Sequence, residues 1–164
     1  MQLLYSQPRR IHETYALCTI ILKYTLSPQQ VIVWDVDHGA SGEWITTPRH
    51  VLVAHTAPVR CVAKATAGQD CHVVVSSSEN GEMFVWDTVD GRVIESKRYP
   101  QFVHTSIQAY RTPDSQHVKL FCCGFYEEIM VVEPFSLEIL FRLSSRLNSD
   151  WVSVKYHYII CENT

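Results

Sequence analysis

The sequence has few of the features that mark a membrane anchor, a nucleic-acid surface or a metal centre. No run approaches the ~20 consecutive apolar residues of a membrane-spanning helix. No basic run exceeds Pro8-Arg9-Arg10, which argues against a nucleic-acid stripe or a polybasic membrane patch. There is no C-x-x-C pair for zinc or redox chemistry and no N-x-S/T sequon that would support secretion. These absences favour a cytoplasmic protein-binding chain without cofactor or metal.

The composition is that of a globular domain. Apolar residues make up 46% of the 164 residues and charged residues 19%, which is enough apolar material for a packed core. The formal charge of −3 comes from 14 Lys and Arg against 17 Asp and Glu. The six cysteines could form three disulfides, but a domain of this size needs none, and reduced buried thiols are the preferred interpretation.

The strongest signal is internal repetition. Three segments share one pattern: QVIVWDVDHGASGEW around Trp34-Asp35, GEMFVWDTVDGRVIE around Trp86-Asp87, and EEIMVVEPFSLEILF, where Val132-Glu133 takes the Trp-Asp place. Positions 34 and 86 are 52 residues apart, and positions 86 and 132 are 46 apart. A WD blade repeats every ~40–45 residues, so the spacing is slightly long for that class of repeat.

Each full unit contains four strand-like runs. His55 and His104, 49 residues apart, each precede a stretch with strand character, and a more apolar run follows. Asn80-Gly81 and Asp90-Gly91 are typical of tight hairpin turns. The pattern predicts an all-β fold: a partial β-propeller with about two complete four-stranded blades and partial blades at each end. A β-sandwich is the alternative, but it does not explain the matched Trp-Asp hairpins.

The Ser, His and acid-like residues of the middle unit could suggest a hydrolase triad. The preferred interpretation is a buried structural network in which His55 bonds to a turn residue, and a serine hydroxyl and the Trp86 indole complete the set. Ser76 or Ser77 could supply that hydroxyl, and Ser77 is the preferred candidate. Asn80 stands where an aspartate is expected, and its amide oxygen can accept from His55 without orienting an imidazolium. The predicted structural network is His55, Ser77, Asn80, Trp86, Asp87, Trp34, Asp35 and His104.

From His55 to Trp151 the chain resembles the amino-terminal propeller of the rabconnectin beta subunit family of WD-repeat proteins. The resemblance is carried by SSENGEMFVWDTVDGRVIE, VHTSIQAY and FCCGFYEEIMVVEPFSLEILFRLSS. It implies a non-catalytic cytoplasmic scaffold that pairs with a rabconnectin alpha-like subunit. It also implies association with the vacuolar-type proton ATPase, peripheral to synaptic or endosomal vesicles, in regulating acidification.

The ends depart from that pattern. We expect a divergent segment over 1–26, a WD-repeat propeller fragment over 27–155 and a divergent tail over 156–164. Two other functions stay open: a peptide or phosphopeptide reader in another complex, and a thiol or serine hydrolase. Candidate partner-binding loop residues are Phe102, Tyr110-Arg111 and Phe125-Tyr126.

Overall fold

A computed structural model describes residues 17–21, 29–39, 41–65, 72–111 and 117–144. These residues form eleven β-strands in three antiparallel sheets, with no helix among them. The all-β prediction is therefore confirmed. The expected tail over 156–164 lies outside the described residues, as does the divergent start over 1–26 except for 17–21.

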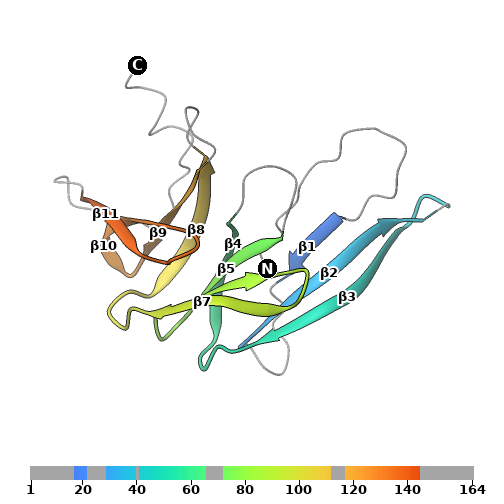
Figure 1. The fold of residues 1–164 in the computed structure, drawn as a ribbon, viewed down its shortest axis with the longest axis horizontal. Helices are drawn as coiled ribbons and strands as arrows, with labels where there is room; N and C mark the ends of the chain where they lie inside the picture. Colours follow the sequence, from blue (N-terminus) through green and yellow to red (C-terminus); the bar gives the residue numbers. More distant parts are fainter. Residues whose placement is uncertain (1–16, 22–28, 40, 66–71, 112–116, 145–164) are drawn as a thin grey trace, which may run out of the picture.

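The three sheets follow one another along the chain and stand side by side in space (Figure 1). The first sheet contains β1 (Leu17–Ile21), β2 (Gln30–His38) and β3 (Trp44–Val53). The second contains β4 (Val59–Lys64), β5 (Val73–Ser78), β6 (Glu82–Asp87) and β7 (Arg92–Arg98). The third contains β8 (His104–Arg111), β9 (Val118–Gly124), β10 (Tyr126–Val132) and β11 (Ile139–Ser144).

Glycine makes the hairpin of the second sheet possible. Gly81 has a φ of 79°, a conformation that side chains with a Cβ rarely adopt. A Cβ there would also collide with the backbone oxygen of Tyr99, whose amide donates to the Gly81 carbonyl at 2.8 Å. The Asn80-Gly81 dipeptide therefore sets both the β5–β6 turn and the close approach of the chain leaving β7.

The registers show that the three Trp-Asp positions are structurally equivalent. Trp34 pairs with Pro48, Trp86 with Val93, and Val132 with Ile139 on the strand that follows. In every sheet a β-bulge lies immediately before this residue, between Val33 and Trp34 in the first sheet and at the same place in the others. β2, β6 and β10 are thus copies of one strand, although the first sheet has three described strands where the others have four.

Two apolar cores hold the sheets together. One core joins the first and second sheets through Val31, Val33, Leu52, Val62, Val74 and Trp86. The other joins the second and third sheets and includes Val75, Val85, Leu120, Met130 and Val132. Because strand side chains alternate between faces, β6 sends Trp86 toward the first sheet and Val85 toward the third. The second sheet is therefore covered on both faces, as an inner propeller blade is.

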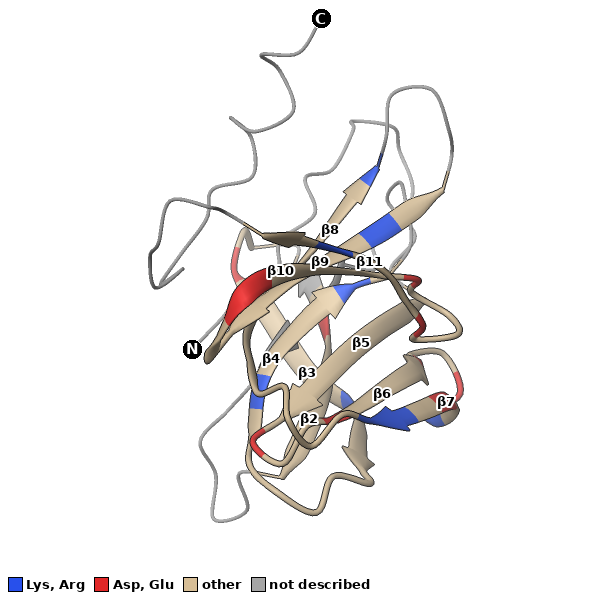
Figure 2. Cartoon of the chain, turned by 90° about the vertical axis from the view of Figure 1, so that its left-hand side faces the viewer, with Lys and Arg blue, Asp and Glu red and all other residues tan. Residues whose placement is uncertain are grey.

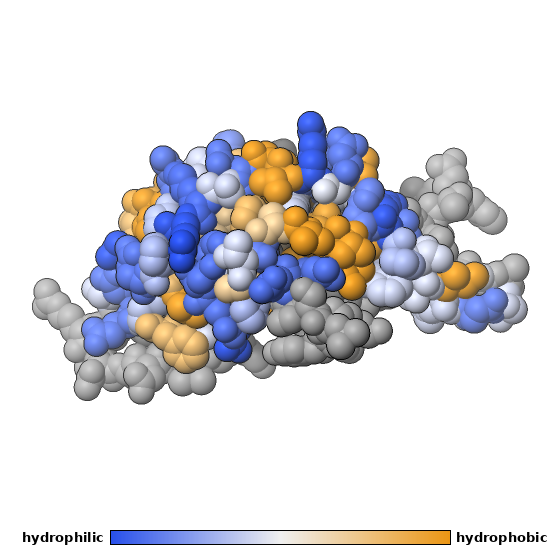
Figure 3. Space-filling model, turned by 90° about the horizontal axis from the view of Figure 1, so that it is seen from below, coloured by the Kyte–Doolittle hydropathy of each residue, from blue (hydrophilic) through white to orange (hydrophobic). Residues whose placement is uncertain are grey.

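The surface is mixed in character. Lysine and arginine alternate with aspartate and glutamate over the strands and turns in Figure 2. Hydrophobic residues also reach the surface in patches between hydrophilic ones (Figure 3). No helix in the described part of the chain is long and apolar enough to cross a bilayer.

Candidate functional site: a buried polar network

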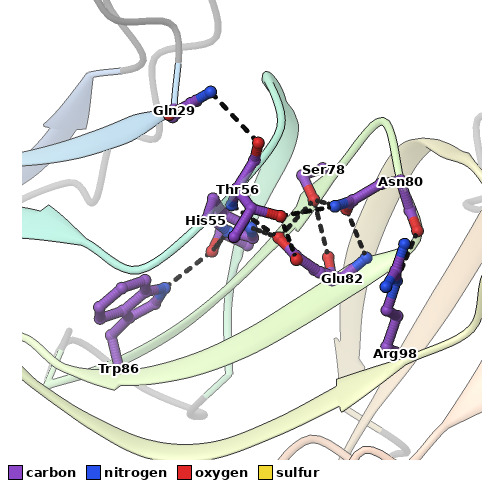
Figure 4. Close-up of polar contacts among 9 residues, drawn as sticks. Gln29, His55, Thr56, Ser78, Asn80, Glu82, Trp86 and Arg98 are labelled. Atoms are coloured by element: carbon purple, nitrogen blue, oxygen red, sulfur yellow. Dashed lines mark hydrogen bonds and ion pairs between the residues drawn. The ribbon is translucent and has the colours of Figure 1, made fainter.

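Two side chains, Trp86 on β6 and His55 in the loop before β4, meet at the hydroxyl of Ser76 on β5. The Trp86 indole Nε1 donates to Ser76 Oγ at 2.7 Å, and His55 Nε2 lies 2.6 Å from the same oxygen. All three residues are buried. Phe84 completes the packing, because its ring meets His55 edge-on at 4.6 Å and Trp86 at 5.4 Å between centroids. Figure 4 shows the indole of Trp86 pointing into this group.

The second ring nitrogen of His55 faces a carboxylate. His55 Nδ1 lies 3.6 Å from Glu82 Oε2, too long for a hydrogen bond but close enough for electrostatic attraction. In one proton arrangement Trp86 donates to Ser76, Ser76 donates to His55 Nε2, and the Nδ1–H faces Glu82 without a hydrogen bond among the described residues. That arrangement requires a neutral imidazole protonated at Nδ1.

Glu82 is itself fixed by the chain that enters the second sheet. The Thr56 backbone N–H donates to Glu82 Oε2 at 2.9 Å, and the Thr56 hydroxyl donates to Oε1 at 2.5 Å. Asn80 Nδ2 donates to the Thr56 hydroxyl at 2.9 Å (Figure 4). The network therefore fastens the loop before β4 to the β5–β6 turn.

Burial sets the protonation states of this network. Burial lowers the pKa of His55 from 6.5 to about 4, although the Glu82 charge opposes part of the shift. For Glu82, partial burial pushes the pKa upward, but the hydrogen bonds from Thr56 outweigh it and hold the pKa at about 2. At neutral pH the pair is a neutral histidine facing a carboxylate.

The network differs from the sequence-based expectation at two positions. Ser77, the preferred candidate, lies on the opposite face of β5, and its buried Oγ has no hydrogen-bond partner among the described residues. Ser76 supplies the hydroxyl instead. Asn80 does not bond to His55, because its Oδ1 accepts from the Ser78 hydroxyl at 2.7 Å and from the Glu82 N–H at 3.2 Å. Glu82, which the sequence interpretation missed, takes the acidic place.

His104 does not repeat the role of His55. It begins β8 and pairs with Gly124, the last residue of β9, whereas the corresponding end of β5, Ser78, pairs with Val59. His104 Nδ1 lies 2.6 Å from the Tyr126 hydroxyl, and its buried Nε2 has no partner in the described part of the chain. Burial lowers its pKa to about 4.

Trp34 has the position of Trp86 but lacks its bond. The Trp34 Nε1 atom is buried and has no hydrogen-bond partner among the residues described. In the backbone register of the first sheet, Ile21 pairs with Ile32 in the place where Ser76 pairs with Phe84 in the second.

The acidic residues after the tryptophan positions stabilise turns in two of the three sheets. Asp87 Oδ1 accepts from the backbone N–H of Val89 at 2.8 Å, and Glu133 Oε2 accepts from the backbone N–H of Ser136 at 2.6 Å. Asp35 instead forms an ion pair with Arg49 on the neighbouring strand, with Arg49 Nε 2.9 Å from Oδ2. These carboxylates serve separate turns and strands.

The arginines are held apart from one another. Arg49 pairs with Asp35, Arg60 with Glu79, and Arg92 with Asp87 and Asp90. A phosphopeptide reader needs several arginines on one surface that are free to bind phosphate. Here Arg49, Arg60 and Arg92 each meet a local carboxylate, and Arg98 Nε donates to the Asn80 carbonyl, so the arrangement of these four gives no support to that function.

The buried cysteines have little thiolate character. Cys61, Cys122 and Cys123 are free and fully buried. Burial raises the pKa of the Cys61 and Cys122 thiols, and a buried thiol that stays protonated is a poor nucleophile. Among the residues described, no cluster of three or more His, Cys, Asp or Glu is arranged to hold a metal ion.

The sheet geometry and the network together match a known class of repeat. The chain is 31% identical over 132 residues to WD repeat-containing protein 72 of Mus musculus, an alignment that covers 76% of this chain. The fold is a partial WD-repeat β-propeller. No protein-family model matches the chain. This WD-repeat chain spans 12% of the length of that curated relative.

Proposed function

We propose that this WD-repeat chain is a non-catalytic scaffold in an assembly that regulates the vacuolar-type proton ATPase and vesicle acidification. The partners in this proposal are a rabconnectin alpha-like subunit and the ATPase, with the chain in the cytoplasm, peripheral to synaptic or endosomal vesicles. The support for these specific partners is the resemblance to the rabconnectin beta subunit family. The support for a scaffold comes from the structure of the network.

One observation supports the scaffold function. The side chains that could take part in catalysis, His55 and Ser76, bond to each other inside the fold. The His55 side chain is 0% exposed, and Ser76 is likewise 0% exposed. A serine nucleophile has to reach its substrate, and this hydroxyl is enclosed by His55 and Trp86. The network therefore stabilises the fold, and we assign recognition of a protein partner to the rims and loops of the sheets.

One rim offers a specific anchor for a partner. Phe125, in the β9–β10 turn, is 77% exposed, and aromatic side chains are common anchors in protein interfaces. Its neighbour Tyr126 is engaged elsewhere, with its ring against Phe102 at 5.3 Å and its hydroxyl against His104. Phe102 also lies under the Arg142 guanidinium at 5.0 Å. Of the expected loop aromatics on this rim, Phe125 is the one available for binding.

Tyr110 and Arg111 fit a partner site less well. The Tyr110 ring packs edge-on against Phe121 at 6.0 Å between centroids, so it supports the third sheet. Arg111 is exposed but ends β8 at the opposite rim from the β9–β10 turn. We therefore place the partner contact on the rim that carries Phe125.

Affinity purification from vesicle extracts tests this proposal. The bait is the tagged full chain, compared with Phe125→Asp and with the matched control Phe135→Asp. Phe135 is 47% exposed in the β10–β11 turn, at the opposite rim. We expect the parent chain and the Phe135 variant to retain subunits of the proton pump and the alpha subunit, and the Phe125 variant to lose most of them.

Thermal melts of all three baits show whether each is folded. Pump subunits absent from the parent bait would contradict the proposed assembly. Equal recovery with both variants would contradict the choice of rim and leave the assembly intact.

A further inference from the structure

The β-bulge of the first sheet holds a different kind of residue from the bulges of the other two sheets. The residue that the strand register skips is Arg49 on β3, Ile94 on β7 and Leu140 on β11. Arg49 binds back onto its own sheet, with its Nε 2.9 Å from Asp35 Oδ2. The first sheet therefore carries a cation at a position where the equivalent residues of the other two sheets are apolar.

Thr47 lies beside this ion pair. It is the cross-strand partner of Asp35, and such partners project from the same face of a sheet with their Cβ atoms ~4.5–5.5 Å apart. In the second sheet the partner of the equivalent acid, Asp87, is Arg92. The first sheet thus has a hydroxyl where the second has a guanidinium, and this hydroxyl is next to a carboxylate that already holds Arg49.

The chain order at this point is Thr47-Pro48-Arg49. Protein kinases of the proline-directed class transfer phosphate to a serine or threonine that is directly followed by proline. Ser27-Pro28 and Thr112-Pro113 are the other such dipeptides of the sequence, and they are followed by glutamine and aspartate. Thr47 is thus the acceptor with a neighbouring arginine, the side chain that binds phosphate most strongly.

The position of β3 leaves this segment accessible. The strand order of the first sheet is β1-β2-β3, so one edge of β3 bonds to β2 and the other has no partner strand among the described residues (Figure 1). The four residues from Thr46 to Arg49 are all exposed. Neighbouring sheets of a propeller stack on the faces of a sheet, and they leave the edge of its last strand open to an enzyme.

We propose that Thr47 is a phosphorylation site for a proline-directed kinase, and that Arg49 then exchanges Asp35 for the phosphate. Thr47 Oγ attacks the γ-phosphorus of ATP, the bond from that phosphorus to the β,γ-bridging oxygen breaks, ADP leaves, and a kinase aspartate accepts the hydroxyl proton. The new phosphate carries almost two negative charges at neutral pH. Its repulsion of Asp35 and its strong pairing with a guanidinium both favour the exchange. The proposal does not depend on the partners proposed above.

Phosphorylation of the full chain in vitro tests the site. The chain is incubated with ATP and a cyclin-dependent or a mitogen-activated kinase, and its peptides are mapped by mass spectrometry. Thr47→Val removes the acceptor, and Thr46→Val is the matched control, because Thr46 is an exposed neighbour that no proline follows. We expect phosphate on Thr47 in the parent and in Thr46→Val, and none in that peptide of Thr47→Val. Thr47 left unmodified by both kinases overturns the proposal.

A rate comparison shows whether the kinase acts on the folded chain. Ser76→Ala removes the acceptor of the Trp86 indole inside the second sheet and leaves Thr47 unchanged. Because Thr47 is exposed in the folded chain, we expect its initial rate of phosphorylation in Ser76→Ala to stay within about two-fold of the parent. A modification that needs unfolding follows the population of the open chain, so a rate many-fold higher in Ser76→Ala overturns the proposal.

Phosphorus NMR of the fully phosphorylated chain tests the exchange of partners. Arg49→Gln is compared with Arg60→Gln, a matched control whose ion pair with Glu79 belongs to the second sheet. A nearby guanidinium favours the dianion, so we expect the second pKa of the phosphate to be higher in Arg49→Gln than in the parent and unchanged in Arg60→Gln. The same pKa in all three chains overturns the exchange.

Discussion

The Trp86 indole and the Ser76 hydroxyl are joined by a 2.7 Å hydrogen bond inside the second sheet, with no exposure of the serine to solvent. The bond links the β6 strand to β5, and His55 extends it to the loop that enters the sheet. The serine, the histidine and the acidic residue of this group thus stabilise the blade by joining its strands and its entry loop. Each element of the network predicts a measurable effect on stability.

Ser76→Ala and Ser77→Ala form a matched pair with opposite expected results. Ser76→Ala leaves the buried Trp86 Nε1–H and His55 Nε2 without their partner, so we expect the free energy of unfolding to fall by about 1–3 kcal/mol. Ser77 Oγ is buried without a partner, so Ser77→Ala should be neutral or stabilising by up to about 1 kcal/mol. Urea denaturation of both variants measures the difference. Equal loss in both would show that the hydroxyl of Ser76 has no special role.

His55→Ala should lower the free energy of unfolding by about 1–3 kcal/mol, because Ser76 loses a partner and Glu82 no longer faces an imidazole. His72→Ala is the control, since His72 is exposed. Thermal melts followed by circular dichroism compare the two with the parent. An unchanged midpoint for His55→Ala would refute the structural assignment of this histidine.

The two tryptophans of equivalent position should respond differently to phenylalanine. Trp86→Phe removes the donor that Ser76 accepts, and we expect it to cost about 1–2 kcal/mol. Trp34→Phe removes a buried donor that has no partner among the described residues, so it should cost clearly less than Trp86→Phe. Chemical denaturation of the two single variants gives the comparison. A larger loss at Trp34 would mean that its indole is satisfied.

The buried histidines should make stability depend on pH. The pKa of both His55 and His104 is lowered from 6.5 to about 4, so the unfolded chain takes up protons that the folded chain excludes. Stability is then full above pH 6.5 and falls as the pH drops toward 4. At pH 5 the expected loss is about 2 kcal/mol per histidine relative to pH 7.5. Glu82, with a pKa of about 2 against 4.5, adds a loss below pH 4.5.

Urea titrations at pH 7.5, 6.5, 5.5 and 5.0 measure this dependence. His55→Gln should remove roughly half of the decline, because His104 supplies the remainder. A flat profile for the parent between pH 7.5 and 5.0 would contradict the neutral, buried state of both rings.

The strands and turns could be predicted from the sequence because they depend on local pattern. Asn80-Gly81 at a turn and Trp34, Trp86 and Val132 on copies of one strand are set by short-range alternation and spacing. The choice of serine was harder, because Ser76 and Ser77 are neighbours on opposite faces of β5. A register error of one residue exchanges them, and the sequence alone does not set the register between β5 and β6.

Two other features of the network could be identified only from three-dimensional contacts. Glu82 follows the turn by one residue, and nothing in its spacing separates it from other surface acids until Thr56 is seen to fix it. His55 stands 31 residues before Trp86, whereas His104 stands 28 residues before Val132, the equivalent position of the third sheet. That difference in spacing was the available signal that the two histidines are not equivalent.

The central claim is that the three sheets stack in chain order. Trp86 on β6 faces the first sheet, and Val132, at the same position on β10, faces the second. A nuclear Overhauser spectrum of the isotope-labelled chain tests it most directly. The account predicts cross-peaks from the Trp86 ring to methyl groups of Val31, Val33 and Leu52, and from the Met130 methyl to Val75 and Val85. Cross-peaks from the Trp86 ring to the third sheet, at Leu120 or Val132, would contradict it.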